Sequence, residues 1–276
     1  MRPFFRVGSL LVLAGISLTA RPVAAQVAES PYHTSLNVDL PVAVLGTAAS
    51  YWGLTILNDK DGLSEAQALA LRKEDVPRFD RFSAGNYSEA ANKASNYPFY
   101  ASFGLAPVLI LADPAMRGHR GQAALLYYET MAVVGTAFTQ TAGRTFRNRP
   151  LTYGADTPMR ERTKRNTENS FFAGHTAAAA AASFCFAKLY NDFHPDSPAR
   201  PWVWAGAAAI PAAVGYYRLE AGKHFLSDNL IGYTVGALIG VGVPQLHKVA
   251  AARGVGFHPA VFPNGATGVA LTWAVK

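Results

Sequence analysis

The chain has 276 residues, of which half are hydrophobic, 25 are Lys or Arg and 18 are Asp or Glu. This composition excludes a disordered chain, and the length is enough for one or two domains with a sizeable core. The single cysteine, Cys185, excludes an internal disulfide and a cysteine-based zinc finger. The sequence also has no internal repeat of the kind that marks a solenoid, a coiled coil or collagen.

The N-terminus is typical of a secretory signal. Arg2 and Arg6 precede an apolar run over residues 7–20, and small residues at 23–25 precede Gln26. A basic start, a short apolar core and a small-residue cleavage site are the three parts of such a signal. We therefore predict a signal peptide over residues 1–25 and an exported protein.

Six apolar segments follow the signal and predict helices, because few of them alternate with the period of two that strands require. Several approach the length of about 20 residues that crosses a bilayer. Glu129, Lys188 and Asp228 lie within these segments, and a charge at the bilayer centre costs about 2.5–3.5 kcal/mol. A membrane-associated bundle is the prediction, and a soluble periplasmic bundle is the alternative. The segments span residues 41–57, 98–112, 122–141, 171–190, 201–217 and 226–245.

The polar regions complete the domain plan. Residues 58–97 form an insert in which 63–72 predicts a short helix capped by Ser64. Residues 253–276 form a tail in which Asn264-Gly265 separates two apolar runs, which is a hairpin signal. The plan is a helical domain over residues 26–252 and a small β-like tail over 253–276.

The loop at residues 142–170 carries seven Lys or Arg against three Asp or Glu, and this accounts for the positive charge of the exported chain. Such a local cluster indicates a specific anion site rather than a nucleic-acid-binding face. It would also satisfy the tendency of basic loops to stay in the cytoplasm. That tendency conflicts with our expectation that the site faces the periplasm.

Three short patterns lie in and after this loop. The first is R-T-F-R-N-R-P at residues 144–150, which supplies Arg144, Arg147 and Arg149 as cations for phosphate. The second is S-F-F-A-G-H-T at residues 170–176, where Gly174 opens an Ala-rich helix whose first N–H groups favour an anion. His175 at that point can protonate a leaving oxygen.

The third pattern places Arg218, His224 and Asp228 at spacings of six and four residues. In a helix, His224 and Asp228 would share a face. A carboxylate bound to one imidazole nitrogen orients the ring and leaves the other nitrogen as a nucleophile or base. Alone, each of the three patterns is more often structural, but together they predict a phosphate site.

The order and spacing resemble the type 2 phosphatidic acid phosphatase and vanadium haloperoxidase superfamily, whose signature is K-x6-R-P, P-S-G-H and S-R-x5-H-x3-D. The resemblance covers residues 142–228 by motif and implies an all-α, six-helix bundle. Four signature positions differ here, since Ala142 stands at the lysine and Ala173 at the serine of the second motif, with Phe172 and Tyr217 at the other two. The missing lysine removes a phosphate-binding cation, which Arg144, Arg147 or Lys164 could replace.

By position, the resemblance implies that His224 is the nucleophile that forms a phosphohistidine, that Asp228 orients it, and that His175 is the general acid and base. Arg149 and Arg218 would clamp phosphate with help from the Gly174 N–H. The phosphatases of this superfamily require neither metal nor cofactor, so none is expected at this site.

The predicted function is an exported phosphatase for a lipid, polyprenyl or small organic phosphate. The predicted partners are such an ester and a membrane, with no nucleic acid. A vanadium-dependent haloperoxidase is the enzymatic alternative, because the same pocket holds vanadate there. A non-catalytic envelope protein that binds anions is the alternative from another class, motivated by Ala142 and Ala173.

Overall fold

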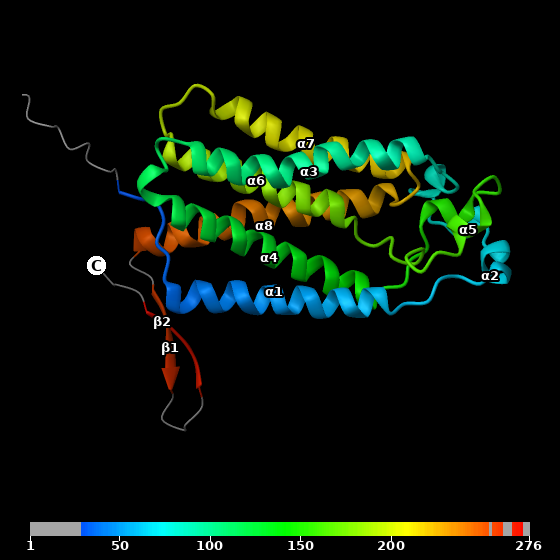
Figure 1. The fold of residues 1–276 in the computed structure, drawn as a ribbon, viewed down its shortest axis with the longest axis horizontal. Helices are drawn as coiled ribbons and strands as arrows, with labels where there is room; N and C mark the ends of the chain where they lie inside the picture. Colours follow the sequence, from blue (N-terminus) through cyan, green and yellow to red (C-terminus); the bar gives the residue numbers. More distant parts are fainter. Residues whose placement is uncertain (1–28, 254–255, 262–266, 273–276) are drawn as a thin grey trace, which may run out of the picture.

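The protein is an all-α bundle of long helices that lie side by side (Figure 1). The computed structural model describes residues 29–253, 256–261 and 267–272, so the expected signal peptide and the Asn264-Gly265 turn lie outside it. Within that part, two short helices, α2 (Glu65–Ala70) and α5 (Met159–Arg162), accompany six long ones, which confirms the predicted bundle. The long helices are α1 (Leu36–Asn58), α3 (Glu89–Ala112), α4 (Arg120–Arg144), α6 (Gly174–Phe193), α7 (Arg200–Glu220) and α8 (Leu226–Arg253).

Local capping explains where two helices of the polar insert begin. The Ser64 hydroxyl accepts a hydrogen bond from the N–H of Gln67, whose side chain returns to the N–H of Ser64, so α2 starts with a capping box. Helix α3 begins at Glu89, nine residues before the predicted start at Pro98, because Ser88 caps it through the N–H of Ala91. Pro98 lies inside α3, and the insert is correspondingly shorter than predicted.

The long helices alternate in direction, and this alternation gathers the three motifs at one end. Helices α1, α4 and α7 finish at the end of the bundle where α2 and α5 lie, and α3, α6 and α8 begin there (Figure 1). Each motif sits at such a junction, so motifs that are distant in sequence meet in space. The opposite end carries the start of α1 and the end of α8.

Helices α6 and α8 approach closely through small residues. A Cβ atom added at Gly236 or Gly240 of α8 would overlap the carbonyl oxygen of Ala177 or Ala181 of α6, and one added at Gly232 would overlap that of Ala173, the residue before α6. Glycines four residues apart face one side of a helix, and their missing side chains let the two backbones approach. This packing fixes the start of α6 against the start of α8.

Much of the outer surface is apolar. Leu45 and Trp52 of α1 and Leu246 of α8 are 68%, 60% and 70% exposed. Among the described helices, α1 and α8 are long and apolar enough to cross a membrane, and α3 with α4 would form a third span broken by a 112° bend. Exposed apolar surface of this extent indicates a membrane or protein contact.

The tail contains the predicted pair of strands. Strands β1 (Gly256–Val261) and β2 (Thr267–Thr272) pair antiparallel, with Gly256 opposite Thr272 and Val261 opposite Thr267. They lie beside the start of α1, at the end of the bundle opposite α2 and α5 (Figure 1).

Candidate active site

The turn between α7 and α8 holds the central histidine. Gly222 has a φ of +66°, and a Cβ there would collide with the Asn86 carbonyl oxygen. Only glycine fits this turn without strain. The turn folds back so that the Arg218 carbonyl accepts the N–H groups of Lys223 at 3.0 Å and His224 at 3.4 Å.

His224 is buried and held in one tautomer. Its Nδ1 lies 2.6 Å from the backbone carbonyl oxygen of Ser170. A carbonyl can only accept, so Nδ1 carries the hydrogen and Nε2 of the neutral ring has its lone pair free. Burial, then the positive charges of Arg218 and Arg149, hold the pKa of His224 well below its ordinary value. The ring is therefore neutral and suited to nucleophilic attack.

Asp228 forms no hydrogen bond with His224 in the described part of the chain, although the sequence predicted one. His224 precedes α8, which begins at Leu226, so the two residues are not on one helical face. Instead Asp228 accepts the Ser170 hydroxyl at 2.6 Å and the Phe225 N–H at 2.9 Å. Asp228 thus fixes Ser170, whose carbonyl orients His224. Ser170 opens the second sequence pattern, but its role in orienting His224 was not predictable, because both of its partners lie more than fifty residues away in the chain.

Arg149 and Arg218 are buried cations without a carboxylate partner. Neither forms an ion pair within the described part of the chain, and both Nε atoms are buried without a hydrogen-bond acceptor. Burial lowers the pKa of Arg149 to about 10, and burial together with the charge of Arg149 lowers that of Arg218 to about 9. Two buried like charges are costly unless an anion joins them.

His175 lies at the start of α6 as predicted, with its ring against Phe99 of α3 at a centroid distance of 4.2 Å. Burial, and after it the charges of Arg218 and Arg149, lower its pKa from 6.5 to about 3. The same two guanidinium groups therefore act on both histidines. Gly174 beside it is required for space, because a Cβ there would meet the Phe138 ring at 2.6 Å.

Arg147 is neutralised. It forms ion pairs with Asp80 at 2.7 Å and with Asp228 at 2.5 Å, and its guanidinium lies 4.8 Å from the Phe225 ring. Asp80 also accepts the backbone N–H of Ser227 at 2.9 Å, which ties the polar insert to the start of α8. Arg147 therefore links Asp80 to Asp228 and is not a free cation for phosphate.

Arg144 lies outside the cluster. It is exposed, its guanidinium bonds to Gln140 one turn earlier, and it lies 5.2 Å from the Trp52 ring of α1. Lys164, the other suggested replacement for the missing lysine, pairs with Glu161 at 2.5 Å. The structure brings neither cation to the two histidines.

Lys223 is a cation that sequence reasoning missed. It immediately precedes His224, and no hydrogen bond or ion pair of its ammonium is recorded among the described residues. Burial, and then the nearby charges of Arg149 and Arg218, lower its pKa from 10.5 to about 8. Its adjacency to His224 was the available signal, but the family signature assigns no role to that position.

Comparisons with known proteins were made against family models, curated proteins and solved structures. Residues 123–251 match the model described as the PAP2 superfamily. A crystal structure of a transmembrane PAP2-type phosphatidylglycerolphosphate phosphatase from Bacillus subtilis matches at 16% identity with a TM-score of 0.43, over 77% of this chain and 96% of that chain. No curated protein matches this chain. All three motifs fall within the matched residues, and the chain is a phosphatase-like member of the PAP2 superfamily.

Proposed function

We propose that this protein is an exported phosphatase that hydrolyses the phosphate monoester of an apolar alcohol, such as a lipid or a polyprenol, through a phosphohistidine. The observation that carries the proposal is a pair of buried guanidinium groups, those of Arg149 and Arg218, that form no ion pair in the described part of the chain. Their charges lower the pKa values of His175 and His224, so both rings are neutral. A phosphate between these arginines would satisfy their unpaired donors and balance their charge.

The first step is attack by Nε2 of His224 on phosphorus. A bond forms between nitrogen and phosphorus as the bond from phosphorus to the ester oxygen breaks, and His175 gives its proton to that oxygen. The negative phosphate offsets the charges that depress the pKa of His175, so the protonated form becomes accessible when substrate is bound. Arg149 and Arg218 hold the phosphoryl oxygens as charge develops on them.

The second step releases phosphate. His175, now neutral, takes a proton from water, whose oxygen attacks phosphorus as the nitrogen–phosphorus bond breaks. His224 returns to the neutral tautomer that the Ser170 carbonyl selects. The site regenerates with no redox change, and the products are one alcohol and one phosphate.

Lys223 is proposed to replace the lysine that Ala142 removes from the signature. Its ammonium has no recorded partner in the described part of the chain, and the same two arginines act on its pKa. Lys60, the other buried lysine beside this loop, is committed elsewhere, because it donates to the carbonyl oxygens of Ala142 and Thr145 and to Asn169.

An apolar cavity supports a substrate with a hydrocarbon chain. It has a volume of about 180 Å³ and lies between α3, α6 and α7. Ser102, Ala106 and Leu109 line it from the face of α3 that also carries Phe99, which contacts His175. Ala207 and Ile210 line it from α7, whose last turn carries Arg218. A chain attached to a phosphate at His175 could extend into this cavity.

The test measures phosphate release from a short-chain phosphatidic acid, a polyprenyl phosphate and a soluble aryl phosphate by the purified protein in detergent. We expect release from the first two, inhibition by vanadate, and complete loss in His224→Ala. Trapping with labelled substrate should give an acid-labile phosphohistidine in the wild type and in a slow His175→Ala variant.

Two outcomes would contradict the proposal. Full activity in His224→Ala would exclude the nucleophile, and phosphate binding without turnover of any ester would favour an anion-binding role. Halide oxidation that depends on added vanadate and peroxide is the matching assay for the haloperoxidase alternative.

A further inference from the structure

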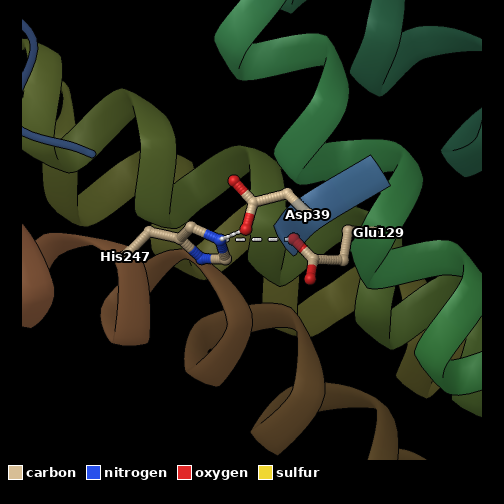
Figure 2. Close-up of side chains that lie close together, drawn as sticks. All are labelled: Asp39, Glu129 and His247. Atoms are coloured by element: carbon tan, nitrogen blue, oxygen red, sulfur yellow. Dashed lines mark hydrogen bonds and ion pairs between the residues drawn. The ribbon is translucent and has the colours of Figure 1, made fainter. Parts of the chain in front are cut away.

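A second cluster of ionisable side chains lies at the opposite end of the bundle. Asp39 of α1, Glu129 of α4 and His247 of α8 point toward one another (Figure 2), and one ligand atom of each lies within 4.8 Å of the others. The Asp39 and Glu129 side chains are each 8% exposed and His247 is 14% exposed. Asp228 lies nineteen residues before His247 on α8, which is about 28 Å along the helix. The cluster is therefore separate from the proposed phosphatase site.

The hydrogen bonds around this cluster turn its free lone pairs inward. Nδ1 of His247 lies 2.8 Å from the Val243 carbonyl oxygen, so it carries hydrogen and leaves Nε2 facing the two carboxylates. One oxygen of Asp39 accepts the Ser35 N–H at 2.6 Å, and the other faces His247. Histidines that bind metals characteristically donate their second N–H to a carbonyl or carboxylate in this way.

Glu129 supplies an independent indication of a missing partner. Its Oε2 atom is fully buried, receives no hydrogen bond from the described residues, and points into the cluster (Figure 2). An unsatisfied buried carboxylate oxygen costs more than an ordinary lost hydrogen bond. No Lys or Arg of the described part forms an ion pair with either carboxylate.

The distances fit a shared cation better than a shared proton. Nε2 of His247 is 3.4 Å from Oδ1 of Asp39 and 3.4 Å from Oε2 of Glu129. An imidazole that shares a proton with a carboxylate approaches it to about 2.7–2.9 Å, and the His194–Asp113 contact of this protein has that length, 2.7 Å. Four ligands at about 2.1 Å in a tetrahedron lie about 3.4 Å apart.

We propose that Asp39, Glu129 and His247 bind one divalent transition-metal ion, with Zn²⁺ as the first candidate. One imidazole nitrogen and two carboxylate oxygens suit Zn²⁺, and two negative charges with a neutral imidazole balance its charge. Helix α1 packs mainly against α4. A metal held by all three helices would tie α1 to α8 at the end remote from the phosphatase site, so its role is structural.

The test loads the full-length protein, purified in detergent without chelating resin, with Zn²⁺ and measures retained metal after desalting. The wild type should keep about one Zn²⁺ per chain, while Glu129→Gln and His247→Ala should keep less than roughly a tenth of that. Zn²⁺ should raise the melting temperature of the wild type, and Mg²⁺ should not. Co²⁺ should give visible absorption bands that are lost in Glu129→Gln.

The matched control is His194→Ala, which removes the histidine of the two-residue pair with Asp113. It should retain Zn²⁺ as the wild type does. If His247→Ala fails to fold, the isosteric Glu129→Gln decides the question. A wild type that retains no transition metal would overturn the proposal, and Zn²⁺ retained by folded Glu129→Gln would overturn it by placing the metal elsewhere.

Discussion

Two guanidinium groups set the protonation of the active-site cluster. Arg149 and Arg218 lie close enough to lower the pKa values of His175, His224 and Lys223, and neither forms an ion pair with a carboxylate in the described part of the chain. The free protein therefore stores electrostatic repulsion that an anion would relieve. This arrangement makes the binding of phosphate and the protonation of His175 mutually favourable.

Acidification should destabilise the free protein between pH 6.5 and 3. The pKa of His175 is about 3 in the folded state and 6.5 ordinarily. Between these pH values, His175 binds a proton in the unfolded state but not in the folded state. Within this window, each such histidine lowers the free energy of unfolding by about 1.4 kcal/mol for each pH unit of acidification. Stability should thus fall as pH drops through 6.5 and gain nothing from these groups above it.

The measurement is the melting temperature of the wild type and of His175→Gln from pH 7 to pH 4. Paired carboxylates also lose stability in acid, so the difference between the two proteins isolates the histidine. The variant should lose fewer degrees, and saturating vanadate should flatten the wild-type curve. Parallel curves would show that His175 is not buried in its neutral form.

Replacing Lys223 tests the proposed substitute cation. Lys223→Ala should lower kcat/KM roughly 10- to 100-fold, because a lost charge-assisted contact costs about 1.5–3 kcal/mol. Lys223→Arg should restore much of the loss. The wild type should lose activity above about pH 8, where free Lys223 loses its proton, and the arginine variant should keep activity to higher pH.

Lys164→Ala is the control for that experiment. Lys164 is half exposed and already paired with Glu161, so its loss should change kcat/KM less than about threefold. Equal effects of the two alanine variants, or an alkaline limb unchanged in Lys223→Arg, would assign Lys223 a general electrostatic role only.

One close contact between helices places the two histidines of the proposed active site. Helices α6 and α8 begin at the site, and their backbones approach along Gly232, Gly236 and Gly240. A side chain at any of these three glycines would separate the helices and move His175 away from His224. The geometry of the proposed site therefore depends on glycines that lie outside it.

A pair of glycine substitutions in α8 measures that dependence. Gly236→Ala should destabilise the protein by about 1–3 kcal/mol, because the added Cβ overlaps the Ala177 carbonyl and overpacked cores relax only partly. Gly242→Ala has open space and should be neutral or stabilising by up to about 1 kcal/mol through helix propensity. Thermal unfolding and phosphatase assays on both variants check this. Equal stabilities of the two variants would mean that α6 and α8 have room for a side chain at Gly236.

The whole molecule has its two proposed sites at opposite ends of the bundle. The loop at 145–173 lies at the end of the proposed phosphatase site, while the loop at 194–199 lies at the end of the Asp39–Glu129–His247 cluster (Figure 1). Several arginines of the basic loop are committed within the protein, since Arg149 and Arg162 are buried and Arg147 is ion-paired. Their charge is therefore a weak guide to which face is cytoplasmic.

Cysteine labelling in cells would determine the orientation. In a Cys185→Ser background, Asp156→Cys marks the site end and Asp196→Cys marks the other end, and both positions are exposed. A site facing the periplasm predicts that an impermeant maleimide added to cells with a permeabilised outer membrane labels Asp156→Cys alone. Labelling of Asp196→Cys alone would reverse the orientation, and labelling of both would exclude a spanning bundle.

Much of the helical plan was predictable from sequence because its causes are local. Apolar segments of about 20 residues predicted all six long helices, and Ser64 marked the start of α2. The predicted start of α3 at Pro98 was wrong, because the apolar run begins there but the Ser88 cap begins the helix nine residues earlier. The motifs also identified His175, Arg149 and Arg218 as a set.

The sequence by itself determined the helices, their order and the residue types available for chemistry, because these depend on neighbours along the chain. Only the tertiary structure decided which groups meet. It gave His224 the Ser170 carbonyl in place of Asp228, paired Arg147 with Asp80, and joined Asp39, Glu129 and His247 from three helices. Such contacts depend on how helices pack across more than fifty residues of chain, and on burial that sets charge and pKa, which no local pattern encodes.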